Sequence, residues 1–170
     1  VSDHGDVILL EDQDRSLWDR SKIDEGLALV EKALSVRGQI SPYAVQAAIA
    51  ALHVRARNKK DTDWPQIVGL YEVLLRLQPS PVIELNHAVA VSMVDGALRA
   101  LNLVDSLAAR GQVSEYHLLH AARGRFLQQL GRLDESVEAY RRALDLATLE
   151  PERRLLAARI AGIGPTPSGP

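Results

Sequence analysis

The stretch HLLHAARGRFLQQLGRLDESVEAYRRALDL, residues 117–146, decides the fold that we expect for this chain. It reads as two helices joined at Gly131, and small residues recur at Gly124, Ser136 and Ala143. Small side chains at these positions allow two antiparallel helices to approach closely, and Tyr140 would fill the seam between this hairpin and the next. The stretch therefore predicts a tightly packed helical hairpin.

A second copy of the pattern lies upstream, in WPQIVGLYEVLLRLQPSP, residues 64–81. Trp64 and Tyr71 take the packing positions of a second helix, and we expect both in the core rather than on a contact surface. Pro79 ends that helix, because proline lacks a backbone N–H and clashes with the preceding turn. Further along, Gly96 precedes Gly131 by 35 residues, close to the period of about 34 residues of tetratricopeptide repeats. Such repeats bind other proteins, and they rarely catalyse reactions.

The composition favours an all-α protein. Hydrophobic residues make up 46% of the 170 residues and aromatic residues only 4%, and few stretches alternate with the period of two residues that half-buried strands show. We expect a right-handed, tetratricopeptide-like stack of antiparallel helix hairpins with about eight helices and no strand. The expected helices span residues 19–36, 42–57, 64–77, 81–94, 97–110, 114–130, 133–147 and 150–162.

Local signals fix several of these boundaries. Ser41 is expected to cap the helix that begins at Pro42, and Thr62 or Asp63 to cap the next one, since their side-chain oxygens accept hydrogen bonds from free N–H groups of the first turn. In the first helix, Gly26 occupies the small-residue position of a repeat's second helix. The partner of that helix is missing from the sequence before it. We therefore expect the extended apolar residues 7–10, or a preceding domain, to cover its open face.

The chain is expected to have three parts. Residues 1–18 would form an extended, acidic connector that packs on the first helix, residues 19–162 the helical domain, and residues 163–170 a disordered tail rich in glycine and proline. The residues expected to dock the connector are Glu11, Asp12, Asp14, Arg15 and Trp18. The chain begins with Val1 rather than methionine, and we interpret it as a piece of a larger protein.

Charge and composition exclude several classes of function. The net charge is −2, with 20 basic against 22 acidic residues, so no overall basic field attracts nucleic acid phosphates. The chain has no cysteine, which removes thiolate nucleophiles, disulfides and cysteine-based zinc sites. No apolar run approaches the length of about 18 residues that a membrane span needs, and no secretion signal opens the chain. We therefore expect a cytoplasmic protein without membrane contact.

Four strings carry a resemblance to a known family. They are LLEDQDRSLWDR (residues 9–20), YAVQAAIAALH (43–53), DTDWPQIVGLYEVLLRLQPSPVIELNHAVAVSMVDG (61–96) and YHLLHAARGRFLQQLGR (116–132). Together they resemble the C-terminal extension of bacterial RNA polymerase sigma factors of the extracytoplasmic-function type. The resemblance covers nearly the whole chain, from about residue 7 to about residue 156.

This resemblance implies an appended, tetratricopeptide-like module that regulates or supports a sigma factor. Its implied partners are the sigma factor's own core domains, RNA polymerase or a regulatory protein, contacted during transcription initiation. In that family the domains that bind DNA and polymerase precede this region, so direct DNA binding is not carried over to these residues. A free-standing adaptor that binds peptides is the alternative.

If the hairpins stack as expected, their first helices line a concave face that binds the partner. There the amide of Asn86 would pair with a peptide backbone and the guanidinium of Arg125 with a carboxylate. Ala90 and Met93 would project beside Asn86. The residues expected to bind a partner on this face are Tyr43, Gln46, His53, Asn86, Arg125 and Gln128.

No catalytic, metal or cofactor site is expected. His117 and His120 lie three residues apart beside Glu115, but no third ligand is spaced to join them, which favours packed or surface histidines over a metal site. The acidic run at residues 11–14 lacks the glycine and the distal glutamate of a calcium loop, and suits helix capping better. No serine lies in a Gly-x-Ser-x-Gly turn. We therefore expect a binding module rather than an enzyme.

Overall fold

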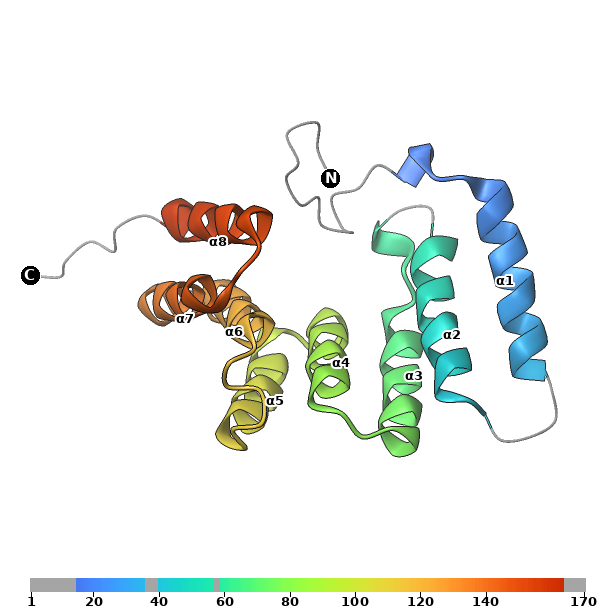
Figure 1. Cartoon of the computed structure of the whole chain (residues 1–170), viewed down its shortest axis with the longest axis horizontal. Coiled ribbons are helices and arrows are strands. Elements are labelled where there is room, and N and C mark those ends of the chain that lie inside the picture. Colours follow the sequence, from blue (N-terminus) through green and yellow to red (C-terminus); the bar gives the residue numbers. More distant parts are fainter. Residues whose placement is uncertain (1–14, 36–39, 57–58, 164–170) are drawn as a thin grey trace, which may run out of the picture. The chain divides into compact units, whose positions relative to one another are not determined.

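A computed structural model describes residues 15–35, 40–56 and 59–163 of the chain. These described residues contain eight α-helices, two short 3-10 helices and no strand (Figure 1). The expected all-α fold and its count of helices are therefore confirmed for the described part of the chain. The tail was expected to begin at residue 163, but Ile163 is the last residue of the final helix. Residues 164–170 and the N-terminal residues 1–14 lie outside the described part.

The helices fall into two compact units. The described residues up to Ala90 form one, called here the N-terminal unit, and those from Val91 onward form the C-terminal unit. Helix α4, Pro81–Val94, carries the chain from the first unit into the second. The two units are described separately below.

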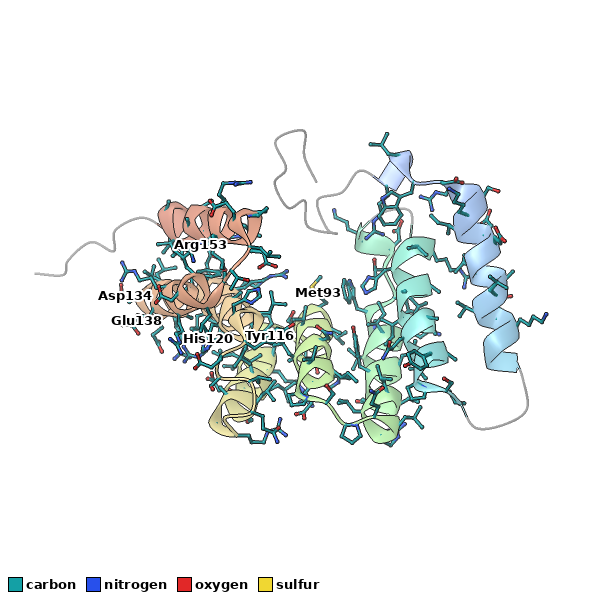
Figure 2. All side chains as sticks on the ribbon, in the orientation of Figure 1. Met93, Tyr116, His120, Asp134, Glu138 and Arg153 are labelled. Atoms are coloured by element: carbon teal, nitrogen blue, oxygen red, sulfur yellow. The ribbon has the colours of Figure 1, made fainter. Side chains whose placement is uncertain are left out.

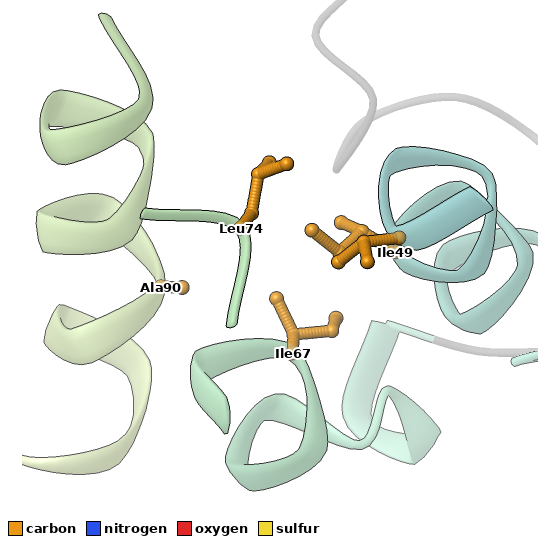
Figure 3. Packing of buried hydrophobic residues seen from close by; sticks show 5 residues of the cluster. Ile49, Ile67, Leu74 and Ala90 are labelled. Atoms are coloured by element: carbon orange, nitrogen blue, oxygen red, sulfur yellow. The ribbon is translucent and has the colours of Figure 1, made fainter. Parts of the chain in front are cut away.

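The N-terminal unit is built from consecutive short helices. A 3-10 helix, Arg15–Leu17, precedes α1 (Arg20–Ser35) and α2 (Pro42–Arg55), and a second 3-10 helix, Lys59–Asp61, precedes α3 (Trp64–Leu77) and the first turns of α4. Each of α1 and α3 packs against α2. The five buried residues of the core shown in Figure 3 are Val45, Ile49, Ile67, Leu74 and Ala90.

Two aromatic residues pack against this core. Trp64 and Tyr71 are partly buried and pack against it. The prediction that both are core residues rather than contact surface is confirmed.

Side-chain caps begin the helices where the sequence indicated. The Ser41 hydroxyl accepts a hydrogen bond from the Tyr43 N–H at 3.2 Å, and the Asp63 carboxylate accepts one from the Gln66 N–H at 3.0 Å. Of the two caps proposed for α3, Asp63 is therefore the cap, and Thr62 is buried beside it. These contacts satisfy N–H groups that have no partner within the helix.

The C-terminal unit continues with α5 (Ala97–Ala109), α6 (His117–Gln129), α7 (Leu133–Leu146) and α8 (Glu150–Ile163). Each of these helices packs against its neighbour in the chain. The helix expected from residue 114 begins three residues later, because the chain forms turns up to Glu115. The Nε2 atom of His120 holds this turn by a hydrogen bond to the Ser114 carbonyl oxygen at 2.7 Å.

The α6–α7 hairpin has the close approach that its small residues predicted. Gly131 takes the left-handed conformation of a tight turn, with φ of 74°. The Ser136 hydroxyl, fully buried, donates a hydrogen bond to the Gly124 carbonyl oxygen at 2.8 Å. A Cβ atom at Gly124 would lie 2.9 Å from the Tyr140 ring, which is closer than real side chains approach.

The small-residue position expected at Gly26 has no packing partner among the described residues. A Cβ atom at Gly26 would meet nothing within 4 Å. The residue lies on the exposed side of α1, so no neighbouring helix requires it to be small.

Replacing Gly124 by leucine should destabilise the C-terminal unit. The added side chain would overlap the Tyr140 ring, and overpacking of this kind lowers the free energy of unfolding by roughly 1–3 kcal/mol. Urea unfolding followed by circular dichroism measures the change.

Gly69→Leu is the matched control, because Gly69 lies in the middle of α3 and a Cβ atom there meets nothing within 4 Å. Leucine is a better helix former than glycine by somewhat less than about 1 kcal/mol, so this variant should be as stable as the native chain or more so. Equal losses in both variants would contradict the close contact at Gly124.

Candidate functional site

The six residues expected on a partner-binding face are distributed over the two units. Four lie in the N-terminal unit, Tyr43, Gln46, His53 and Asn86, and two in the C-terminal unit, Arg125 and Gln128. Tyr43 is 81% exposed, and Gln46 is exposed one turn further along α2. Asn86 is exposed on α4, whereas Ala90, expected beside it, is only 2% exposed and belongs to the core. The α2 positions thus offer an aromatic and an amide side chain to solvent.

His53 belongs to a different site from the other residues of α2. Its ring is half-buried and meets the edge of the Trp64 ring, with 5.2 Å between ring centroids. Its carbonyl oxygen accepts a hydrogen bond from Arg15 at 3.1 Å. His53 therefore packs inside the N-terminal unit instead of presenting its ring to a partner.

Arg15 forms a buried polar site in the N-terminal unit. Arg15 is only 9% exposed. Its Nη1 atom donates hydrogen bonds to the carbonyl oxygens of His53, at 3.1 Å, and Ala56, at 2.8 Å. These carbonyls stand at the C-terminal end of α2, where they lack intrahelical partners and the helix dipole is negative. A buried cation is thus satisfied by the end of a helix.

Neighbouring residues hold the same segment in place. The Arg15 guanidinium lies over the Trp18 ring, 5.3 Å from its centroid, in a cation–π contact. Arg20 donates to the carbonyl oxygens of Val54, at 3.3 Å, and of Arg15 itself, at 3.5 Å. Residues 15–20 are therefore attached to the end of α2 by Arg15 and Arg20, and the Trp18 indole stacks on Arg15 within the segment.

The expected connector is thus visible only in its last part. The connector was expected to pack on the first helix, but Arg15 binds the end of α2, and Trp18 contacts Arg15 within the same segment. Glu11, Asp12 and Asp14 lie outside the described residues, as do the apolar residues 7–10 expected to cover α1. Arg20 was missed by the sequence reasoning, because a single arginine after an aspartate gives no signal for a contact 34 residues away.

In the C-terminal unit, the side chains of Gln128 and Arg125 both lie near Tyr140. The Tyr140 hydroxyl donates a long hydrogen bond, 3.4 Å, to the Gln128 amide oxygen. Burial raises the pKa of Tyr140, and the positive charges of Arg159 and Arg125 oppose that rise. Gln128 therefore has a partner inside its own unit.

Arg153 repeats in the C-terminal unit what Arg15 does in the N-terminal one. Its Nη1 atom donates to the carbonyl oxygens of Leu144, at 2.7 Å, and Ala147, at 3.0 Å, at the end of α7 (Figure 2). In each unit, one guanidinium nitrogen bridges two carbonyls three residues apart. This arrangement joins α8 to α7.

The two histidines of α6 have protein partners. The Nε2 atom of His117 lies 3.2 Å from a carboxylate oxygen of Glu152, at ion-pair distance but without hydrogen-bond geometry, and His120 bonds to Ser114 as described above. Among the described residues no group of three or more histidine, aspartate or glutamate side chains is placed to hold a metal ion. In the same part of the chain, no helix has the length and apolar character to cross a membrane.

Comparison with known proteins gives two matches. Residues 1–34 match the model of a family of unknown function (DUF6596). An uncharacterized protein of Rhizobium meliloti (strain 1021) is 47% identical over 165 residues, which cover 97% of this chain and 38% of the relative. The chain thus spans well under half the length of this relative. No solved structure matches this chain.

Acid should destabilise the N-terminal unit through His53. Burial first, and then the positive charge of Arg15, lower the pKa of His53 below its ordinary value of 6.5, while the ring faces Arg15 and Trp64. Because the unfolded chain then binds the proton more readily, this contribution to the free energy of unfolding is full above pH 6.5. It should fall as the pH drops from 6.5 to the lowered pKa of the folded state.

Urea titrations of the native chain and His53→Gln on both sides of pH 6.5 measure this effect. The other four histidines are present in both proteins, so their contributions cancel in the difference. The stability advantage of the native chain should shrink with acid. A difference that does not change with pH would show that His53 titrates as if exposed.

Proposed function

We propose that this chain is a protein-interaction module attached to an RNA polymerase sigma factor, and that it contributes to transcription initiation. Its partners would be the sigma factor's own core domains, polymerase or a regulatory protein. It would act by binding rather than by catalysis, in the cytoplasm where polymerase is found.

The observation that carries this proposal is the joint presence of four strings that resemble sigma-factor extensions, at residues 9–20, 43–53, 61–96 and 116–132. Two of these strings contain residues with specific contacts or backbone conformations in the structure. The first contains Arg15 and Trp18, and the last contains Gly124 and the turn at Gly131.

The comparisons support attachment to a longer protein. The relative from Rhizobium meliloti matches this chain almost from end to end, yet the match takes up only 38% of that relative. A module of this kind within a longer polypeptide fits an appended domain better than a free-standing adaptor.

The surface of the N-terminal unit supports binding of a protein partner. Tyr43 is 81% exposed at the start of α2, and Leu17 is 83% exposed on the 3-10 helix beside Arg15. Tyrosine is enriched in protein interfaces. The net charge of −2 provides no comparable attraction for nucleic acid.

The coding sequence upstream of Val1 gives the first test. It should encode the polymerase-binding and helix-turn-helix domains of a sigma factor. An initiator methionine immediately before residue 1 would instead support the free-standing adaptor.

In vitro transcription with purified core polymerase gives the second test. Deleting residues 1–170 from the full-length protein should change the yield of promoter-specific transcript, while the shortened protein still binds core polymerase. Unchanged transcription from every promoter that the full-length protein recognises would contradict a role in initiation.

The chain itself should not bind duplex DNA. With a net charge of −2 it neutralises few phosphates, so we expect a dissociation constant well above about 1 μM at physiological salt. Fluorescence anisotropy with a random labelled duplex measures this, and the full-length protein on its promoter is the positive control. Submicromolar binding by the chain alone would contradict the assignment of DNA contacts to other domains.

A further inference from the structure

We propose that Arg15 is a latch, a positioning residue that fixes the polypeptide entering the N-terminal unit against the C-terminal end of α2. The latch consists of Arg15, Trp18 and Arg20 on one side and the carbonyls of Val54, His53 and Ala56 on the other. The inference rests on the proposed function for its biological meaning, but its structural part stands independently.

The geometry distinguishes this contact from an ordinary surface arginine. Exposed Arg99 pairs with Asp95, only four residues away, and an exposed pair of this kind contributes little to stability. Arg15 is 9% exposed and reaches backbone carbonyls 38 and 41 residues away in sequence. The planar guanidinium fixes the direction of the Arg15 side chain, because one of its nitrogens, Nη1, donates to both carbonyls at once.

The contact is made to the end of α2, beside the core of the unit. The buried core residues Val45, Ile49, Ile67 and Leu74 belong to α2 and α3, whereas Arg15 binds backbone carbonyls of His53 and Ala56. If the latch only positions the segment, the α2–α3 core should stay in place when Arg15 is replaced.

His53 connects the latch to Trp64. Its carbonyl accepts the Arg15 hydrogen bond, and its ring meets the edge of the Trp64 ring. The end of α2 thus contacts both Arg15, through the His53 carbonyl, and Trp64, through the His53 ring. In the proposed sigma-factor module, it would set the direction in which the chain leaves this unit toward the preceding domains.

The test measures whether Arg15 fixes the segment to α2. Because the chain has no cysteine, spin labels go only where cysteine is introduced, at exposed Leu17 in the segment and at exposed Gln46 on α2. Gln46 stands ten residues before Ala56, about 15 Å along the helix. Double electron–electron resonance should give one narrow distance distribution with Arg15 present.

Arg15→Lys keeps the charge but loses the planar fork, and should broaden that distribution. It should also speed hydrogen exchange of the Trp18 amide, which donates to the Arg15 carbonyl, by about tenfold or more. Exchange in α3 should be unchanged. Arg55→Ala is the control, because Arg55 is exposed at the same end of α2 and makes none of the latch contacts, and it should alter neither measurement.

A narrow distribution in both Arg15→Lys and Arg15→Ala would overturn the latch. Loss of protection throughout α2 and α3 would overturn it too, since Arg15 would then be part of the unit's fold. In the full-length protein, Arg15→Lys should change promoter-specific transcription and Arg55→Ala should not. A broadened distribution with unchanged transcription would leave the latch intact and count against the proposed function alone.

Discussion

Short helices leave many backbone carbonyls without partners, and this constraint shapes both units. Each α-helix is between 13 and 16 residues long, and the last four carbonyls of each have no intrahelical N–H. Roughly a quarter of the helical carbonyls must therefore find water or another donor. Where a helix end is buried, a side chain has to supply it.

Two arginines meet this need in the same way. Helix α2 of the N-terminal unit and helix α7 of the C-terminal unit each end at an alanine in extended conformation. These are Ala56, with ψ of 120°, and Ala147, with ψ of 130°. The arginine then bridges the carbonyl of that alanine and the carbonyl three residues before it. The difference lies in where the arginine comes from. Arg153 belongs to α8, the next helix in the chain, so it joins two consecutive helices. Arg15 belongs to the segment that precedes α1, so it binds that segment to α2.

The sequence predicted those features whose causes are local. Helix starts at Ser41 and Asp63, the turn at Gly131 and the contact of Gly124 with Tyr140 each depend on residues a few positions apart or on one hairpin. The contacts of Arg15 and Arg20 depend instead on residues 34 to 41 positions away, and no pattern in a single sequence signals them. At Gly26 the repeat pattern marks a small-residue position, but among the described residues nothing lies within 4 Å of a Cβ atom there. On the candidate partner-binding face, Tyr43, Gln46 and Asn86 are exposed, whereas the His53 ring packs against Trp64. Partner binding by these residues stays a prediction.

The use of arginine inside the units also bears on which partners they suit. In the C-terminal unit, Arg123 pairs with Asp105 and Arg142 with Glu115, and Arg153 is engaged by carbonyls. These side chains tie helices together, so their hydrogen-bond donors are engaged within the unit. On the N-terminal unit, Leu17 and Tyr43 expose most of their apolar and aromatic surface. Under the proposed function, a protein partner would contact that unit through such side chains, since aromatic residues are enriched in protein interfaces.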